Sequence, residues 1–405
     1  MNPNPFDKAT PKRTRTSSGS VVRIFRGEFV GPVASSLRAQ GMDVRVLIKE
    51  YFGDLAQQLA SAELATLGEL QSTILSAEDK AAGGSTRQAN SNTLKTMQAL
   101  RQSSYLGVIG EVNLAELEED MDPNEFYRAL SVPPPKPSAI WIVYEYAGLS
   151  SVQAYSVPAG IRRAKLPPQK GFFGNPVEPP ALPPWNARAD YVVKGILRQA
   201  IEALANLHES GFVHRSIGRS SLILTTRNTL DTREASSVYA TALSNLLVKL
   251  SDFGFAVPSR EATRDEEFRS RARTFGLNFE KDEFTVTTVN FAIAEDMHAL
   301  GFVMMGLLLT SLAEVTDPKA PLPNTDEDTL QRLFSEIFEK DVKGQFREYL
   351  EAEDAWSNVV QLLDEKDGWT VLETLLLARE KAVELKGTDQ IFTVRGLLSN
   401  PLFAS

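Results

Sequence analysis

The hydrophobic pattern of this chain changes at about Tyr191, and this change limits the possible folds more than any other feature. Before it, β-branched and apolar residues cluster in short runs that indicate strands: VVRIF at 21–25, VRVLIKEY at 44–51, SSYLGVIGEV at 103–112 and AIWIVYEYAG at 139–148. After it, apolar residues recur on one helical stripe: Val193, Leu197, Ala200, Leu204 and Leu207. Strands come first and helices later, so we predict an α+β fold in two lobes.

Further helices are indicated on both sides of this change. Residues 54–75 read as a helix, and Gly211 follows the stripe where a left-handed cap would end it. The apolar run at 298–313 is shorter than the roughly 18 residues of a spanning helix, so we predict a buried core helix. Thr325 to Asp328 form a capping pattern before another helix.

Composition excludes several classes of function. At 405 residues with 42% apolar content, the chain can bury a large core. Its formal charge of -9 argues against a general binder of nucleic acid or anionic membranes, since those surfaces require net positive patches. The chain has no cysteine, which excludes disulfides, thiol catalysis and cysteine-ligated metals, and its three histidines argue against a histidine-rich metal site.

Polar and proline-rich stretches separate these segments. Residues 76–92 contain Gly83-Gly84 and read as a loop. Residues 131–138 and 166–185 are rich in proline, which fixes φ and lacks a donor, so they form neither helix nor central strand. They are typical of stiff spacers or of docking sites for aromatic grooves. Residues 1–20 read as a disordered or targeting tail, and the basic, acid-poor composition of residues 1–26 fits the cytosol or an organelle. The insertion GFFGNPVEPPALPPW leads us to expect a plastid, with the cytoplasm as the alternative.

Two motifs follow the helical stripe. GFVHRSIGRSSLIL spans 211–224, and LLVKLSDFGFA at 246–256 is a β-like run that ends in Asp252-Phe253-Gly254. In this order, and with Lys49 in VLIKEY far upstream, the motifs resemble the eukaryotic protein kinase family from about Val21 to Phe403. The resemblance implies a bilobal fold with a small β-rich N-lobe at 21–148 and a larger, mainly α-helical C-lobe at 149–405. It implies insertions at about 76–104, 151–189 and 225–245.

The resemblance also implies a nucleotide site. Lys49 resembles the lysine that holds the α- and β-phosphates of ATP and pairs with a helical glutamate, and Asp252 resembles the aspartate that binds Mg²⁺. Glu63 is the favoured partner of Lys49 because Leu67 lies one turn further on, and Glu69 is the second choice. The alternative is that these charges only align the lobes.

Other positions follow the same resemblance. Tyr144 resembles the gatekeeper, and Glu145 to Ala147 resemble the hinge whose backbone contacts adenine. Asp296 resembles the aspartate that starts a helix and braces the catalytic loop. Arg395 to Phe403 resemble the closing segment of the larger lobe.

The reacting positions depart from the family. Ser216, Gly218 and Ser221 stand where it has an aspartate base, a lysine near the γ-phosphate and an asparagine on the second metal. Serine without an activating partner is no base near neutral pH, and loss of a general base alone costs about 10²–10⁴ in rate. Arg219 could compensate for the missing lysine.

The glycine-rich loop departs too. FRGEFVGPV at 25–33 keeps Gly31 before Val33, but Arg26 and Glu28 replace glycines, and a glutamate there would repel a triphosphate. Gly27 could restore the turn if the register shifts by one residue.

The segment after Asp252 lacks an Ala-Pro-Glu anchor, and AIAED with Glu295 is the nearest substitute. Arg215 could meet a phosphorylated Thr274 or Thr287, or could simply pack or pair.

We therefore expect a pseudokinase, a kinase-fold scaffold or regulator that binds ATP with Mg²⁺ or nothing. The alternative is an atypical active Ser/Thr kinase with a non-standard base. We expect protein partners to bind the proline-rich and polar insertions, and we expect no nucleic-acid binding and no transmembrane segment. The sequence leaves the oligomeric state open.

Overall fold

The protein is described from a computed structural model. The structure describes residues 21–29, 31–39, 44–81, 100, 102–113, 139–146, 150–155, 169–170, 176–177, 181–227, 239, 241–314 and 327–404. The fold is mixed α+β, with small antiparallel sheets. The chain divides into two compact units. Unit 1 comprises Met1–Gly148, Arg227–Thr232 and Asp252–Ala256, and unit 2 comprises Leu149–Thr226, Arg233–Ser251 and Val257–Ser405.

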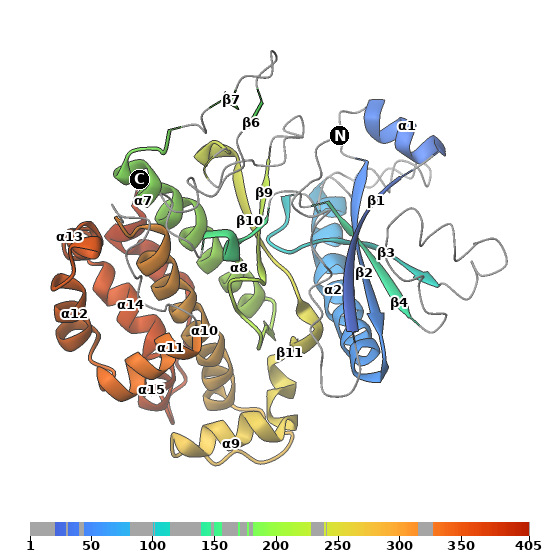
Figure 1. Ribbon diagram of the computed structural model, residues 1–405. Coiled ribbons are helices and arrows are strands. Elements are labelled where there is room, and N and C mark those ends of the chain that lie inside the picture. The colour runs from blue at the N-terminus through green and yellow to red at the C-terminus, as the bar shows by residue number, and fades with distance from the viewer. Residues whose placement is uncertain are drawn as a thin grey trace. The chain divides into compact units, whose positions relative to one another are not determined.

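Unit 1 contains an antiparallel sheet (Figure 1). Its strands, in spatial order, are β1 (Val21–Glu28), β2 (Arg45–Phe52), β4 (Ile140–Glu145) and β3 (Val108–Asn113). Each of the four apolar runs predicted as strands overlaps one of these strands, so that prediction is confirmed. A helix, α1 (Gly31–Ala39), connects β1 to β2.

Helix α2 (Asp54–Ala81) lies along one face of this sheet. It carries a buried stripe at helical spacing: Ala56, Ala60, Glu63, Leu67 and Leu70. The helix ends at Ala81 rather than at Leu75, so the loop predicted from Ser76 begins later. The rest of that predicted loop, residues 82–92, lies outside the described residues.

The segment 252–256 also belongs to unit 1 and packs on α2. Phe253, at the start of the 3₁₀ turn Phe253–Phe255, is fully buried, and its ring meets Tyr105 edge-on at 5.7 Å. A Cβ atom on Gly254 would lie 3.1 Å from the Leu59 Cβ and 3.2 Å from its carbonyl oxygen. Glycine therefore permits this close approach to the helix.

Unit 2 is mainly helical. Its longer helices are α7 (Trp185–Asp190), a π-helical stretch (Tyr191–Leu197), α8 (Arg198–Glu209), α9 (Glu266–Thr274), α10 (Val286–Ser311), α11 (Glu327–Arg332), α12 (Arg347–Glu351), α13 (Ser357–Glu365), α14 (Gly368–Leu376) and α15 (Ala378–Glu384). Two short π-helical stretches, Leu333–Ile337 and Val342–Phe346, flank the turn before α12. The predicted stripe forms α8 and the stretch before it. Gly211 has φ 83° just beyond the helix, which confirms the left-handed cap.

The strands of unit 2 are short. They are β5 (Ser150–Ser151), β6 (Gln169–Lys170), β7 (Pro176–Val177), β8 (Phe212–Val213), β9 (Leu222–Thr226), β10 (Leu246–Leu250) and β11 (Val257–Pro258). Strand β9 lies between β10 and β5, and β8 pairs with β11. The β8–β11 and β9–β10 pairs position both ends of the loop that joins β8 to β9.

Helix α10 is the core of unit 2 and contacts α11, α14 and α15 (Figure 1). Thr285 and Thr288 form a capping box at its start. It is long and apolar enough to cross a membrane, but 83% of its most apolar window is buried inside the protein, as in the core helix of a globular protein. The prediction of a buried core helix is confirmed. The predicted cap at Thr325 lies outside the described residues, and α11 begins at Glu327.

His298 on α10 makes the stability of unit 2 depend on pH. Its Nδ1 donates to the Leu376 carbonyl at 2.7 Å, and burial, aided by the charge of Arg379, lowers its pKa from 6.5 to about 4. Between these values the unfolded chain binds more protons than the folded one, so stability falls as the pH decreases from 6.5 to 4. We expect a loss of about 3 kcal/mol over this window relative to His298→Asn. Urea unfolding of the wild type and of His298→Asn across this pH range measures the loss. If the free energy of unfolding depends on pH equally in both proteins, the prediction is refuted.

Candidate functional site

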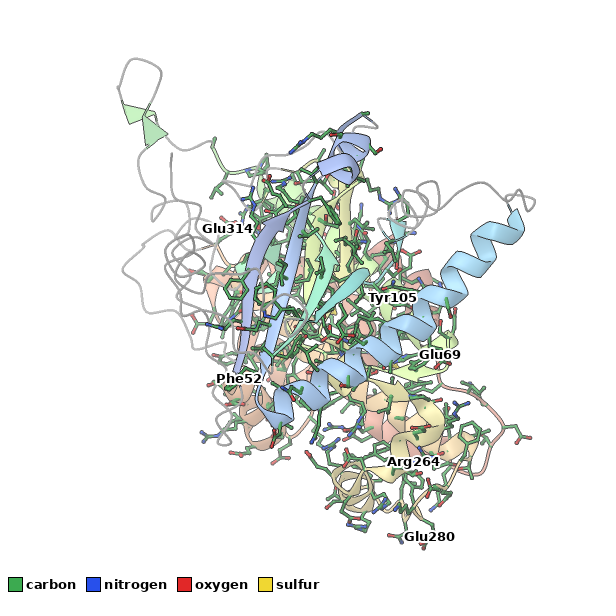
Figure 2. All side chains as sticks on the ribbon, turned by 90° about the vertical axis from the view of Figure 1, so that its right-hand side faces the viewer. Phe52, Glu69, Tyr105, Arg264, Glu280 and Glu314 are labelled. Carbon is green, nitrogen blue, oxygen red and sulfur yellow. The ribbon has the colours of Figure 1, made fainter. Side chains whose placement is uncertain are left out.

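A buried charge cluster forms on one face of the unit 1 sheet. Side chains alternate along β2, so Lys49 and Tyr51 share the face that α2 covers. The Lys49 Nζ atom lies 2.6 Å from an Asp252 oxygen and 3.3 Å from a Glu63 oxygen. Glu63 is thus confirmed as the helical partner of Lys49. Glu69, the second choice, is exposed further along α2 (Figure 2).

Tyr51 is a member of this cluster that the sequence interpretation missed. Its hydroxyl donates to the second oxygen of Glu63 at 2.6 Å and lies 3.4 Å from the Tyr144 hydroxyl. The Lys49 ammonium also lies 4.8 Å from the centre of the Tyr144 ring. Alternation along the strand was the available signal, since Tyr51 follows Lys49 by two positions.

The charges of the cluster compensate one another. Burial alone would lower the pKa of Lys49, but the carboxylates of Asp252 and Glu63 outweigh it, so the pKa is raised. Burial raises the pKa of Tyr51 and of Tyr144, which keeps both phenols neutral. Lys49 is therefore a permanent cation held between two carboxylates.

Glu145, at the predicted hinge, is hydrogen-bonded to Gly107. Its backbone N–H donates to the Gly107 carbonyl at 2.9 Å, and its carboxylate accepts from the Gly107 N–H at 2.9 Å. The Glu145 N–H is thus bonded to Gly107, and contacts of the Glu145 backbone with adenine stay a prediction. Tyr144, the predicted gatekeeper, is fully buried. Ala147 lies outside the described residues.

The glycine-rich stretch does not form one continuous loop. Phe25 to Glu28 belong to β1 and pair with β2, and Gly31, at φ 71°, begins α1, which also contains Val33. Gly27 pairs with Val46, and a Cβ there would lie 2.9 Å from the Ile48 Cδ1 atom. Its glycine serves strand packing, so the idea that Gly27 restores a turn is wrong. Nucleotide contacts of Gly31 and Val33 stay a prediction.

In unit 2, Asp296 braces the loop between β8 and β9. Its carboxylate accepts the backbone N–H groups of His214 and Arg215, both at 2.7 Å, and lies 3.0 Å from His208 Nε2. Burial alone would raise its pKa, but the His208 hydrogen bond and charge, with further help from His214, outweigh this and lower the pKa. The bracing role is confirmed. Asp296 lies within α10, however, and not at its start.

His214 is buried beneath this loop. Its Nε2 lies 2.9 Å from the Ser251 carbonyl oxygen, and its Nδ1 accepts the Ser216 N–H at 3.3 Å. Because a carbonyl only accepts, Nε2 carries the proton. Both ring nitrogens are used to hold the loop, and Arg215 adopts φ 64° within it.

Ser216, Gly218 and Ser221 lie in this loop. The Ser221 hydroxyl donates to the Gly218 carbonyl at 3.0 Å and accepts the Gly218 N–H at 2.9 Å. Ser221 is buried, so its oxygen closes a turn and is directed away from solvent. Ser216 uses its backbone N–H on His214. From Gly211 to Ser221 the sequence contains no carboxylate.

Arg219 lies against the core helix. Its guanidinium carbon is 3.3 Å from the position a Cβ on Gly306 of α10 would take, and its carbonyl accepts the Gln153 N–H at 3.0 Å. This placement does not support the idea that Arg219 compensates for the missing lysine.

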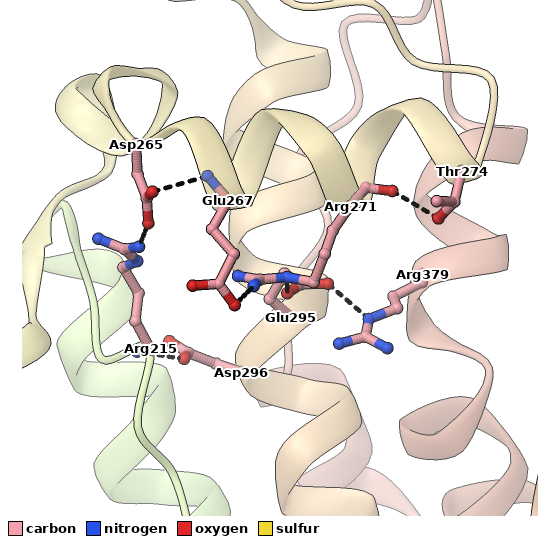
Figure 3. Close-up of polar contacts among 8 residues, drawn as sticks. All are labelled: Arg215, Asp265, Glu267, Arg271, Thr274, Glu295, Asp296 and Arg379. Atoms are coloured by element: carbon pink, nitrogen blue, oxygen red, sulfur yellow. Dashed lines mark hydrogen bonds and ion pairs between the residues drawn. The ribbon is translucent and has the colours of Figure 1, made fainter. Parts of the chain in front are cut away.

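Arg215 pairs with an aspartate rather than with a threonine (Figure 3). Asp265, its partner, also caps α9 by accepting the Glu267 N–H at 2.8 Å. Burial and then the charge of Arg271 lower the pKa of Arg215. The Thr274 hydroxyl donates to the Arg271 carbonyl at the end of α9. Arg215 thus pairs, as the alternative interpretation had it, and its meeting with a phosphorylated Thr274 or Thr287 stays a prediction.

Glu295 connects three helices in the same region (Figure 3). Its carboxylate accepts from Arg271 of α9 at 2.6 Å and from Arg379 of α15 at 2.5 Å. The residue predicted as a substitute anchor thus links α9, α10 and α15.

Removing the Asp265 carboxylate should loosen α9. Asp265→Ala deletes both the helix cap and the partner of Arg215, and we expect a cost of about 1–2 kcal/mol. Asp265→Asn keeps a capping oxygen, so it should cost less than about 1 kcal/mol. Hydrogen exchange of the α9 amides measures both. Equal opening in the two variants would show that capping contributes nothing.

No family model matches the chain, and no curated protein matches it. Among the described residues, no group of three or more histidine, cysteine, aspartate or glutamate side chains is placed to hold a metal ion. Magnesium binding at Asp252 therefore stays a prediction.

Proposed function

We propose that this chain is a protein-kinase-like pseudokinase, a scaffold or regulator that transfers no phosphate. The observation that carries the proposal is the loop braced by Asp296. The backbone N–H groups of His214 and Arg215 donate to Asp296, which holds the loop in place. The Ser221 hydroxyl is buried in a turn with Gly218. A phosphoryl-transfer site needs a proton acceptor and a metal ligand in that loop. From Gly211 to Ser221 the sequence contains no carboxylate and no side-chain amide, so this loop supplies neither the proton acceptor nor the metal ligand.

The cluster in unit 1 supports a binding or structural role. Lys49 is a buried cation, and Asp252 is the carboxylate of the cluster that reaches solvent, with 46% of its side chain exposed. If ATP binds, Lys49 would hold its phosphates and Asp252 would take Mg²⁺, which neutralises phosphate charge. Glu63 and Tyr51 would hold the ammonium in place.

Phosphate transfer tests this function directly. We expect purified protein with MgATP to incorporate no more phosphate, into itself or a generic protein substrate, than Asp252→Ala does. Incorporation by the wild type that disappears in Asp252→Ala would refute the proposal and identify an active kinase with a non-standard base.

Nucleotide binding is tested separately by thermal unfolding. A ligand specific to the folded state raises the midpoint by mass action. We expect MgATP to raise the unfolding midpoint, and ATP with a chelator to raise it less. In Asp252→Ala, MgATP and ATP with a chelator should have the same effect on the midpoint. A midpoint unchanged by MgATP would leave a scaffold without nucleotide.

Partner binding belongs to the same proposal. We place it on the insertions at about 151–189 and 225–245, since long polar and proline-rich segments commonly serve recognition. Deletions within these insertions should abolish capture of a cognate protein, and they must spare the described residues, since Tyr155 and Arg188 are buried.

A further inference from the structure

The outer edge of the unit 1 sheet is formed by β1. Within the described part of the chain, β1 has a neighbouring strand on one side only, β2, with which it pairs from Val21 to Glu28 without a bulge. Edge strands present unpaired backbone groups that can pair with another chain. Ile24, near the middle of β1, has 59% of its side chain exposed.

The hydrogen-bonding pattern between β1 and β2 shows which backbone groups of β1 point away from β2. The Phe29 N–H donates to the Val44 carbonyl at 2.8 Å, so Phe29 and Val44 form a bonded pair of the antiparallel ladder. Such pairs alternate along a strand. The backbone groups of Ile24 and Glu28, at even positions, therefore point away from β2.

The opposite edge of the same sheet is protected. Strand β3 has a register shift between Val108 and Gly110. The Gln71 side chain of α2 accepts the Val108 N–H at 2.7 Å and donates to the Val108 carbonyl at 3.0 Å. A bulge and a covering side chain are the usual protections of an edge, and β1 carries no bulge against β2.

We propose that the β1 edge pairs with β1 of a second copy of this chain, antiparallel about a two-fold axis at Gly27. The sequence from 24 to 30, IFRGEFV, is complementary to itself about that glycine. The pairs formed twice by symmetry are Arg26 with Glu28, Phe25 with Phe29, and Ile24 with Val30, the last lying outside the described residues.

The charges of Arg26 and Glu28 favour this register, and a second copy of the chain is favoured as the partner. An axis at Arg26 or at Glu28 would place like charges opposite one another, which destabilises a strand pair, whereas the axis at Gly27 places opposite charges there. The chain's own residues 1–20 fit less well. They contain three prolines, which lack backbone donors. Identical edges that pair isologously close the assembly at two copies.

Charge reversal in full-length protein tests the pairing. Sedimentation equilibrium should give a mass that rises with concentration for the wild type. Glu28→Arg should weaken association on the order of tenfold or more, since it creates two like-charge pairs and leaves the Arg26–Tyr146 stack in place. The double variant Arg26→Glu with Glu28→Arg restores opposite charges and should restore association.

Cross-linking tests the register independently, because the chain has no cysteine of its own. A mixture of Arg26→Cys and Glu28→Cys proteins should form a disulfide-linked heterodimer, since bonded cross-strand pairs lie about 5.5 Å apart at Cα. Either protein alone should cross-link far less. A mass independent of concentration up to about 1 mM, far above the dissociation constants of specific interfaces, would overturn the proposal. Association unaffected by Glu28→Arg, or equal cross-linking in the unmixed proteins, would overturn it as well.

Discussion

Replacement of Lys49 by methionine is expected to lower the free energy of unfolding of unit 1 by about 3–5 kcal/mol. The ammonium is buried with 5% of its side chain exposed, and Glu63 beside it with 3%. Without the cation, Glu63 remains a buried carboxylate that accepts from the Tyr51 hydroxyl. An uncompensated buried charge is the costly outcome of breaking such a pair. Asp252 adds less, because its side chain is half exposed.

A second variant separates charge from packing. Glu63→Gln keeps an oxygen for the Tyr51 hydroxyl but carries no charge, so Lys49→Met with Glu63→Gln should recover more than half of the loss. Hydrogen exchange of the β2 and α2 amides reports the opening free energy of this unit. If the double variant is as unstable as Lys49→Met, lost packing and not buried charge explains the effect.

Replacement of Asp296 by alanine is the second large effect, about 3–5 kcal/mol in unit 2. One carboxylate accepts from the backbone of His214 and of Arg215, and from His208. Hydrogen bonds to a charged acceptor contribute more than neutral ones, and both loop amides lose such an acceptor in this variant. The loop should lose its order first, and urea unfolding gives the total cost.

His208→Ala is the matched control, because it removes one of these donors and leaves the loop amides bonded. We expect it to cost about a third as much or less, on the order of 1 kcal/mol. Equal losses in the two variants would mean that His208, rather than the braced amides, is what Asp296 supports.

The sequence predicted the elements that depend on local pattern. The strands came from clustered β-branched residues, and Glu63 was chosen over Glu69 because it continues the stripe of Leu67 and Leu70. Asp296 was found from its motif. In each case the deciding residues lie within one or two turns of each other, or in a motif of fixed spacing.

Long-range partners were not predictable in this way. Asp265 pairs with Arg215 across 50 positions of sequence, and nothing in the local pattern of α9 distinguishes it from Glu266 or Glu267. The helix α1 after β1 was missed because FRGEFVGPV was interpreted through a glycine pattern. The hydrogen bonds between Glu145 and Gly107 were not predicted either. Pairing of this kind is decided by tertiary packing and not by propensity.

The placement of residues 252–256 in unit 1 affects how that unit can form. Its sheet and α2 are encoded before Gly148, but the counter-ion Asp252 and the buried Phe253 come about a hundred residues later. Synthesis proceeds at about 5–20 residues per second, so Asp252 is added several seconds or more after Gly148. During this time the charge cluster of the nascent N-terminal part is incomplete. A polypeptide cut at Gly148 would remain in that unfinished state, and a separate peptide carrying 252–256 should complete it in trans.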